Sequence, residues 1–287
     1  MPEWWERFFH EPIDLSSLGL FRILLGLLLV LDAITYGRAA PSLLHPDGLV
    51  PFTIWRDGRH RSFFSVLRWF PASPRSVTVV LWIYGVAGFG VAAGVAMPWT
   101  AVVAFIAGVS VHHRNRYVLN AGDSLRRVLT FLLIFSGAGQ VWSVDAALGA
   151  GITPAAGAPW ALRLMQLQMA FLYLHAFYTK LVGRTWRRGT ATHYATHLLA
   201  HRKCRLPVWL DRPLVHCVAT YGTLLAEFAG AVLVWFEPTR YIALLALLGL
   251  HLSLQLLMRM HLFQWTMMAA LVLFVPGEVT AGWLGLG

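Results

Sequence analysis

The sequence has few charged residues and a long stretch without any. Asp, Glu, Lys and Arg together make up 13% of its 287 residues, whereas soluble domains carry roughly a quarter. Between Ser76 and His113 none of these four residue types occurs. This composition excludes an ordinary soluble domain. It predicts an all-α, polytopic integral membrane protein, because a helix satisfies its own backbone hydrogen bonds in lipid.

Several patterns of known chemistry are also absent from the sequence. The two cysteines, Cys204 and Cys217, form neither a CxxC motif nor a disulfide framework. No P-loop, dinucleotide-binding glycine pattern or Ser-His-Asp pattern occurs in a credible context. The net charge of +10 does not indicate a nucleic-acid partner, because the basic residues lie in short segments between apolar runs. No internal repeat of the kind found in many transporters is present.

Hydrophobic residues, 57% of the chain, gather in eight segments that we predict to be transmembrane helices. The uncharged stretch would be about 57 Å long as a single helix, so it must fold back, and Met97-Pro98-Trp99 is the predicted turn. Residues 3–12 are amphipathic and are predicted to lie along the membrane interface. We expect a single domain over residues 1–287, without a separate soluble domain. The predicted spans are 17–36, 76–96, 98–113, 125–144, 161–182, 213–236, 240–258 and 261–277.

Lys and Arg are distributed unevenly between alternate connections. The connections after the first, third, fifth and seventh spans hold eighteen of them, and the opposite side holds three. Since cytoplasmic loops are enriched in Lys and Arg, this bias places both termini outside the cytoplasm. The eighteen are Arg38, Arg56, Arg59, Arg61, Arg68, Arg75, Arg114, Arg116, Arg126, Arg127, Arg184, Arg187, Arg188, Arg202, Lys203, Arg205, Arg212 and Arg259, and the three are Arg7, Arg163 and Arg240.

Ionisable side chains within the predicted spans need a partner or a function, because each costs about 2.5–3.5 kcal/mol at the centre of the bilayer. Arg22 and Asp32 would lie about 15 Å apart along one helix, so each needs a partner on another helix. A pair between Arg22 and Glu227 is one option. Lys180 has two interpretations: a desolvated base, or a lysine that snorkels to the interface beside Trp186.

Two polar motifs lie outside the apolar segments. Asn120-Ala-Gly-Asp-Ser opens the fourth span, where Asp123 or the serine after it could be a helix N-cap, or Asn120 and Asp123 could present acceptors to a cavity. His193, His197 and His201 recur every four residues and would share one helix face. Such a stripe can bind a metal, but no carboxylate stands beside it in the manner of HExxH. We interpret it as a polar loop helix and predict no metal site.

Several segments, taken in order, resemble a known family. The segment from Phe21-Arg22 to Asp32 resembles the opening of the membrane region of vitamin K-dependent γ-carboxylase, whose bacterial relatives are the HTTM (horizontally transferred transmembrane) proteins. The matching pieces follow in the family's order over nearly the whole chain. The later ones are Trp142-Ser-Val-Asp145, Lys180-Leu181, Trp186, Gly189, Val215-His216, Leu224-Leu225, Glu227, Ala229-Gly230, Arg240 and His251.

The resemblance implies a helical bundle in a bacterial inner membrane that holds a quinol-type cofactor, such as reduced vitamin K or menaquinol, beside a base. It implies carboxylase-like chemistry on a peptide or a small acidic substrate, with Lys180 deprotonating the hydroquinone. The family's Asn-Asn-His run is not reproduced at 120–123, where its histidine is absent. The candidate catalytic residues are Lys180, Asn120, Asp123, Glu227 and His251, and the candidate cofactor-binding residues are Arg22, Tyr173, His175 and Trp186.

Two other functions are compatible with the sequence. The chain could be a non-enzymatic membrane factor for the maturation or export of a secreted peptide, as in some HTTM relatives. It could also be a metal-dependent membrane oxidase built on the stripe of His193, His197 and His201. The three hypotheses differ in whether they need Lys180, a peptide partner or a metal.

Overall fold

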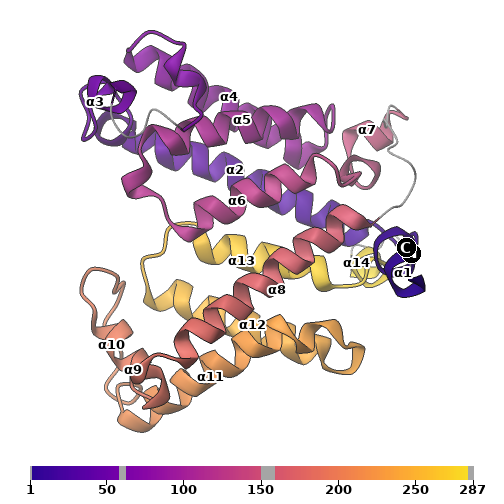
Figure 1. Cartoon of the computed structure of the whole chain (residues 1–287), viewed down its shortest axis with the longest axis vertical. Coiled ribbons are helices and arrows are strands. Elements are labelled where there is room, and N and C mark those ends of the chain that lie inside the picture. Colours follow the sequence, from indigo (N-terminus) through magenta and orange to yellow (C-terminus); the bar gives the residue numbers. More distant parts are fainter. Residues whose placement is uncertain (1, 58–62, 150–158, 284–287) are drawn as a thin grey trace. The chain divides into compact units, whose positions relative to one another are not determined.

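The computed structural model describes residues 2–57, 63–149 and 159–283, and these residues form helices and no β-strand (Figure 1). The all-α class predicted from the sequence is therefore confirmed. The chain divides into two compact units. Unit 1 is Met1–Arg163 with Val275–Gly287, and unit 2 is Leu164–Phe274.

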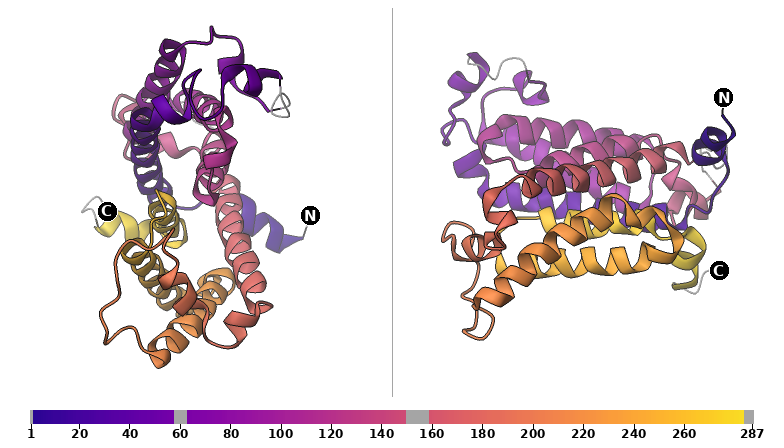
Figure 2. Two further views of the ribbon diagram at one scale, coloured as in Figure 1. Left: turned by 90° about the vertical axis from the view of Figure 1, so that its left-hand side faces the viewer. Right: turned by 60° about the horizontal axis from the view of Figure 1, so that its bottom comes forward.

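Unit 1 is built around four helices that pack in sequence order, α2 on α4, α4 on α5 and α5 on α6 (Figure 2). Gly26 and Gly88 allow α2 and α4 to approach closely, since a Cβ on Gly88 would lie 3.0 Å from the Leu29 Cβ and one on Gly26 would overlap the Ala92 backbone. The helices of this unit are α1 (Glu3–His10), α2 (Ser16–Leu43), α3 (Phe52–Asp57), α4 (Pro74–Ala93), α5 (Trp99–Arg114), α6 (Ala121–Leu133), α7 (Val144–Ala147) and α14 (Gly277–Trp283).

The turn predicted at Met97-Pro98-Trp99 is confirmed. Helix α4 ends at Ala93, and Gly94 follows it in the left-handed conformation with φ of 67°, as glycine commonly does after a helix. Helix α5 then begins at Trp99. The uncharged stretch is therefore two helices that pack against each other.

The fourth predicted span, 125–144, is wrong in its bounds. Helix α6 begins at Ala121 and ends at Leu133, which makes it roughly 20 Å long. Gly137 then adopts φ of 66°, and a short 3-10 turn (Ala138–Gln140) and α7 follow. Arg22 donates hydrogen bonds to the backbone oxygens of Ala138, Val141 and Trp142, and these bonds hold the segment in a conformation other than a continuous α-helix.

Unit 2 is formed by the remaining helices. Helices α10 and α12 both pack against α11, and α12 also packs against α13 (Figure 2). Helix α8 starts one turn before the unit boundary and continues into unit 2. The helices are α8 (Trp160–Leu181), α9 (Arg184–Arg187), α10 (Ala191–His197), α11 (Pro213–Ala231), α12 (Glu237–Leu257) and α13 (Phe263–Leu271).

Four of the described helices are long and apolar enough to cross a membrane, namely α2, α4, α11 and α12, and the bent pair of Phe263–Phe274 and Gly277–Trp283 would make a fifth. Every one of the eight predicted ranges contains a helix, but eight crossings are not confirmed. Large apolar side chains are exposed along these helices, among them Leu31 on α2, Trp82 on α4, and Leu245 on α12. Surfaces of this kind are typical of contact with lipid.

Two of the basic residues attributed to cytoplasmic connections do not lie in a solvated loop. Arg114 ends α5 and Arg126 lies within α6, and both are fully buried. Arg59 and Arg61 lie outside the described residues. Without the two buried arginines, sixteen Lys and Arg residues stand on one side of the predicted membrane and three on the other. This uneven distribution still favours the same orientation.

Candidate functional site

A buried cluster of charged and polar side chains joins the four main helices of unit 1. Asp32 Oδ2 accepts a hydrogen bond from the Tyr84 hydroxyl at 3.0 Å and lies 2.9 Å from His112 Nε2. Arg126 Nη2 donates to Asp32 Oδ1 at 2.8 Å and also to Asp123 Oδ1. All five side chains are buried. The partner that Asp32 needs is therefore Arg126, supported by an imidazole and a phenol.

Asn120 and Asp123 form a capping box at the start of α6. The Asn120 side chain accepts from the backbone N–H groups of Gly122, at 2.7 Å, and Asp123, and the Asp123 carboxylate accepts from the Asn120 N–H at 2.8 Å. The N-cap is thus Asn120, not Asp123 or Ser124. Asp123 is therefore both the N3 residue of the capping box and a partner of Arg126.

Arg22 is enclosed by backbone carbonyl groups of unit 1. Its five N–H groups make five hydrogen bonds, so none is left over for a cofactor, and the cofactor-binding role assigned to Arg22 from the resemblance does not match its surroundings. These carbonyl groups are the partners of Arg22, so the suggested ion pair between Arg22 and Glu227 is not formed. The hydrogen bonds run from Nε to Ala138 O (3.1 Å), from Nη1 to Val91 O and Ala92 O (both 2.7 Å), and from Nη2 to Val141 O (3.3 Å) and Trp142 O (2.7 Å).

The end of α4 explains why a cation is stable at this position. The carbonyl groups of Val91 and Ala92 lie in the last turn, where the regular i+4 N–H partners are missing, and the helix dipole favours positive charge there. Val91 O also accepts the Gly94 N–H at 3.2 Å. Gly94 provides the space, since a Cβ at this residue would lie 2.7 Å from Arg22 Nη1.

The five carbonyl groups around Arg22 form what we call the carbonyl cage. Asp145 fixes the position of the 138–142 segment, which supplies three of them. Its carboxylate accepts hydrogen bonds from the backbone N–H groups of Ala96 and Met97, both at 2.8 Å. Its own N–H donates to Gly94 O at 3.1 Å. Two of the segments that carry the family resemblance, Phe21-Arg22 and Trp142–Asp145, therefore meet in one structural feature.

In unit 2, Lys180 at the end of α8 pairs with Glu227 on α11. The distance from Lys180 Nζ to Glu227 Oε1 is 2.5 Å, and the two side chains are 27% and 8% exposed. The Lys180 ammonium also lies 5.4 Å from the centre of the Trp186 ring, within the range of a cation–π contact. The other carboxylate oxygen, Glu227 Oε2, is buried and has no hydrogen-bond partner in the described part of the chain.

A second buried polar group lies close to this ion pair. The Tyr173 hydroxyl is 2.8 Å from His251 Nε2, and His251 Nδ1 is 2.6 Å from Gln264 Oε1. Because the amide oxygen only accepts, Nδ1 carries the proton, and Nε2 accepts from the phenol. The structure thus brings four of the residues predicted from the sequence together as two pairs, Lys180 with Glu227 and Tyr173 with His251.

The remaining predicted residues of unit 2 have different surroundings. Trp186 lies against Lys180, as described above, whereas His175 is exposed and stacks on Phe171 with ring centres 6.5 Å apart. The structure therefore does not bring His175 to the ion pair. Asn120 and Asp123 belong to unit 1, where they cap α6 and bind Arg126.

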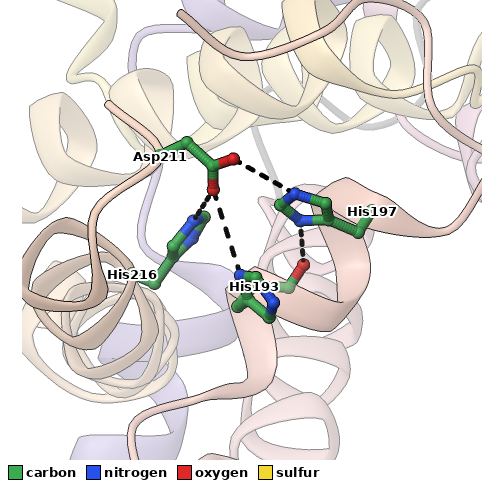
Figure 3. A group of neighbouring side chains, drawn as sticks. All are labelled: His193, His197, Asp211 and His216. Carbon is green, nitrogen blue, oxygen red and sulfur yellow. Dashed lines mark hydrogen bonds and ion pairs between the residues drawn. The ribbon is translucent and has the colours of Figure 1, made fainter. Parts of the chain in front are cut away.

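Two of the three histidines of the stripe meet a carboxylate that the sequence analysis did not consider. Asp211, which precedes α11, lies between His193 and His197 of α10 and His216 of α11 (Figure 3). Asp211 Oδ1 is 2.8 Å from His216 Nε2 and 3.9 Å from His193 Nδ1, and Oδ2 is 3.2 Å from His197 Nε2. The hydrogen bond with His216 is the main reason why the pKa of Asp211 lies below its ordinary value, and His197 adds to it. These four side chains could hold a metal ion.

The comparison with protein families identifies a family for this chain. The sequence model of the HTTM domain matches residues 10–278, which is nearly the whole chain. No solved structure matches the chain.

Proposed function

We propose a function from the premise that this chain belongs to the HTTM domain family: it is a membrane enzyme that removes a proton from the hydroxyl group of a quinol-type ring at the Lys180–Glu227 pair. The observation that carries the proposal is Glu227 Oε2, a buried carboxylate oxygen without a hydrogen-bond partner beside an ion pair. A buried acceptor left unpaired costs about 1–3 kcal/mol. A hydroxyl group of a bound molecule would remove that cost.

The ion pair itself supplies the base. A proton can pass from Lys180 Nζ to Glu227 Oε1 over 2.5 Å, which leaves an amine and a carboxylic acid, and apolar surroundings reduce the advantage of the charged form. The amine then takes the hydroxyl proton, and the ammonium that forms stabilises the oxyanion left on the ring.

The residues of unit 2 fit a lipophilic quinol in polarity and in space. A cavity of about 460 Å³ lies among α10, α11 and α12, with Val218, Ala226, Leu250 and Leu254 in its wall. Ala226 directly precedes Glu227 on α11, but neither Lys180 nor Glu227 is part of the cavity wall. When bound, a hydroquinone would supply an oxidisable ring that reacts with oxygen and yields a strong base for carboxylation of a peptide or small acidic substrate.

Replacing Lys180 with methionine tests the base. We expect menaquinol-dependent oxygen uptake by the protein in lipid nanodiscs to fall by at least about 100-fold, the typical contribution of a general base, while the helix content measured by circular dichroism stays unchanged. The matched control is Lys203→Met, which alters the only other lysine of the sequence, an exposed one.

Either of two results would contradict the proposal. One is oxygen uptake by the Lys180→Met protein that equals uptake by the unsubstituted protein. The other is the absence of any menaquinol-dependent uptake by the unsubstituted protein, in which case co-purification of an exported peptide would favour the non-enzymatic maturation factor.

We also propose the bacterial inner membrane as the location, with eight crossings and both termini outside the cytoplasm. Helix α8, of 22 residues, is roughly 33 Å long and reaches across the hydrocarbon layer, whereas α5 and α6 reach only about 24 and 20 Å. We place α5 and α6 as crossings as well, although each is shorter than the hydrocarbon layer. The buried cluster of unit 1 lies near their ends, and there Arg126 and Asp123 are shielded from lipid by their own partners.

The two connections on either side of α11 test this orientation. Cys204, which is exposed, should react with a membrane-impermeant maleimide only after the cells are made permeable, in a Cys217→Ser background. A cysteine introduced as Glu237→Cys, with Cys204→Ser, should react in intact cells. Mass spectrometry of the labelled protein measures both, and the reversed pattern would show that the orientation is inverted.

A further inference from the structure

We propose that His193, His197, Asp211 and His216 bind one divalent transition-metal ion, with zinc favoured by the donor set, and that the ion fastens α10 to the start of α11. The site is independent of the Lys180–Glu227 pair and does not depend on the proposed reaction. It differs from a metal centre on the histidine stripe of α10, because two of its four ligands lie outside that helix and His201 is not one of them.

The geometry of the four side chains carries the proposal. Their ligand atoms all lie within 4.8 Å of one another, and all point toward a common space (Figure 3). Around a tetrahedral zinc ion with bonds of about 2.0 Å, the ligand atoms lie roughly 3.3 Å apart. The distances from the Asp211 oxygens to the three ring nitrogens, 2.8, 3.2 and 3.9 Å, bracket that value.

The ring of His197 is oriented for ligation by a contact within its own helix. His197 Nδ1 lies 2.8 Å from the backbone oxygen of His193, and Nε2 lies 3.2 Å from Asp211 Oδ2. The contact with the backbone holds the ring so that Nε2 faces the Asp211 carboxylate. A second-shell hydrogen bond of this type is usual for metal-binding histidines.

Three imidazoles and one carboxylate make a suitable and complete ligand set for zinc. The four protein ligands fill a tetrahedral site, which is typical of a structural ion rather than a catalytic one. Neutral imidazoles with one carboxylate leave a net charge of +1 on the bound ion, smaller than the charge of the ion in water. The ligands come from a helix of seven residues, α10, and from the start of α11, so the ion would join a short element to a long one.

The position of the cluster allows exchange with the aqueous phase. His193 and His197 are 49% and 39% exposed and Asp211 is 33% exposed, whereas His216 is 6% exposed. An ion can therefore enter from the solvent side and meet His216 at the inner end. His201 offers no fifth ligand, because it is exposed outside the cluster while its backbone oxygen accepts the Arg259 N–H at 2.7 Å.

The test is metal analysis of the full chain, purified in detergent with its affinity tag removed. Plasma mass spectrometry should find about one equivalent of zinc per chain, and cobalt added to the chelator-treated protein should give the intense visible bands of a tetrahedral site. Asp211→Asn and His216→Ala should each weaken zinc binding by at least about 100-fold, more than the loss of an outer-shell partner costs. Chelator should lower the melting temperature of the unsubstituted protein but not that of Asp211→Asn.

His201→Ala is the matched control, since it removes a histidine of the same stripe and should leave one equivalent bound. The proposal is overturned if the unsubstituted protein takes up no stoichiometric zinc or cobalt. It is also overturned if His201→Ala weakens binding as much as His197→Ala, because the ion would then lie on α10 alone. Asp211→Asn keeps the size and fold of the site, so its loss of metal separates ligation from misfolding.

Discussion

Replacing Asp32 with asparagine lowers the free energy of unfolding by about 3–5 kcal/mol, the cost of removing one partner of a buried ion pair. Arg126, His112 and Tyr84 all direct hydrogen-bond donors or ring nitrogens at the Asp32 carboxylate. Asparagine has nearly the same shape, but its amide carries no charge and replaces one accepting oxygen by an NH₂ group that only donates. The positive charge of the Arg126 guanidinium, which is fully buried, is then only partly balanced by negative charge.

Chemical denaturation of the purified protein in mixed micelles measures this loss. The matched control is Asp47→Asn, which makes the same chemical change at an exposed residue, and surface changes of this kind usually stay within about 0.5 kcal/mol. A double-mutant cycle with Arg126→Met should show coupling, since the two side chains are in contact. If Asp32→Asn unfolds at the same denaturant concentration as the control, the cluster does not hold the four helices together.

The need for a partner at Asp32 could be predicted from the sequence, but the identity of the partner could not. A carboxylate inside an apolar run must be compensated, and that argument uses only its neighbours in the sequence. Arg126 is 94 residues away, and only the packing of α6 against the other helices brings it near. In the count of basic residues, Arg126 was attributed to the connection after the third span, although the predicted fourth span begins at residue 125.

A signal for the buried position of Arg126 was nevertheless present. Arg126 follows Asp123 by three residues and precedes Leu129 and Leu133 by three and seven, so these residues share one face of a helix. A charge on the apolar face of an amphipathic helix indicates a buried ion pair. Counting basic residues by loop ignores this periodicity, which is why the count included Arg126.

The metal-ligand cluster was only half predictable for a similar reason. His193 and His197 stand four residues apart on one helix, and their common face follows from the helical repeat alone. Asp211 reaches them only because the connection after α10 returns to the start of α11, and no sequence periodicity describes such a return. For this reason the sequence shows no carboxylate beside the histidine stripe. His201 was grouped with His193 and His197 by its spacing, although His201 lies beyond the end of α10.

Replacing Arg22 with methionine should also lower the free energy of unfolding by about 3–5 kcal/mol, although Arg22 has a carbonyl cage where Asp32 has an ion pair. Hydrogen bonds to a charged group contribute roughly 1.5–3 kcal/mol each, and methionine removes all five that Arg22 makes. Relief of the buried charge offsets part of this loss. Without Arg22, Val91 O keeps the Gly94 N–H at 3.2 Å, whereas Ala92 O lies in the last turn of α4, where the helix supplies no N–H partner.

Arg22→Lys distinguishes the shape of the cage from its charge. Lysine keeps the positive charge at the end of α4, but its three N–H groups radiate from one atom and cannot span acceptors on both α4 and residues 138–142. We expect Arg22→Lys to be nearly as unstable as Arg22→Met in the same denaturation experiment. Arg38→Met and Arg38→Lys on the same helix are the controls, because Arg38 is exposed. A stable Arg22→Lys protein would show that positive charge at the helix terminus is sufficient, and that the Trp142–Asp145 segment does not need the planar guanidinium to hold its place.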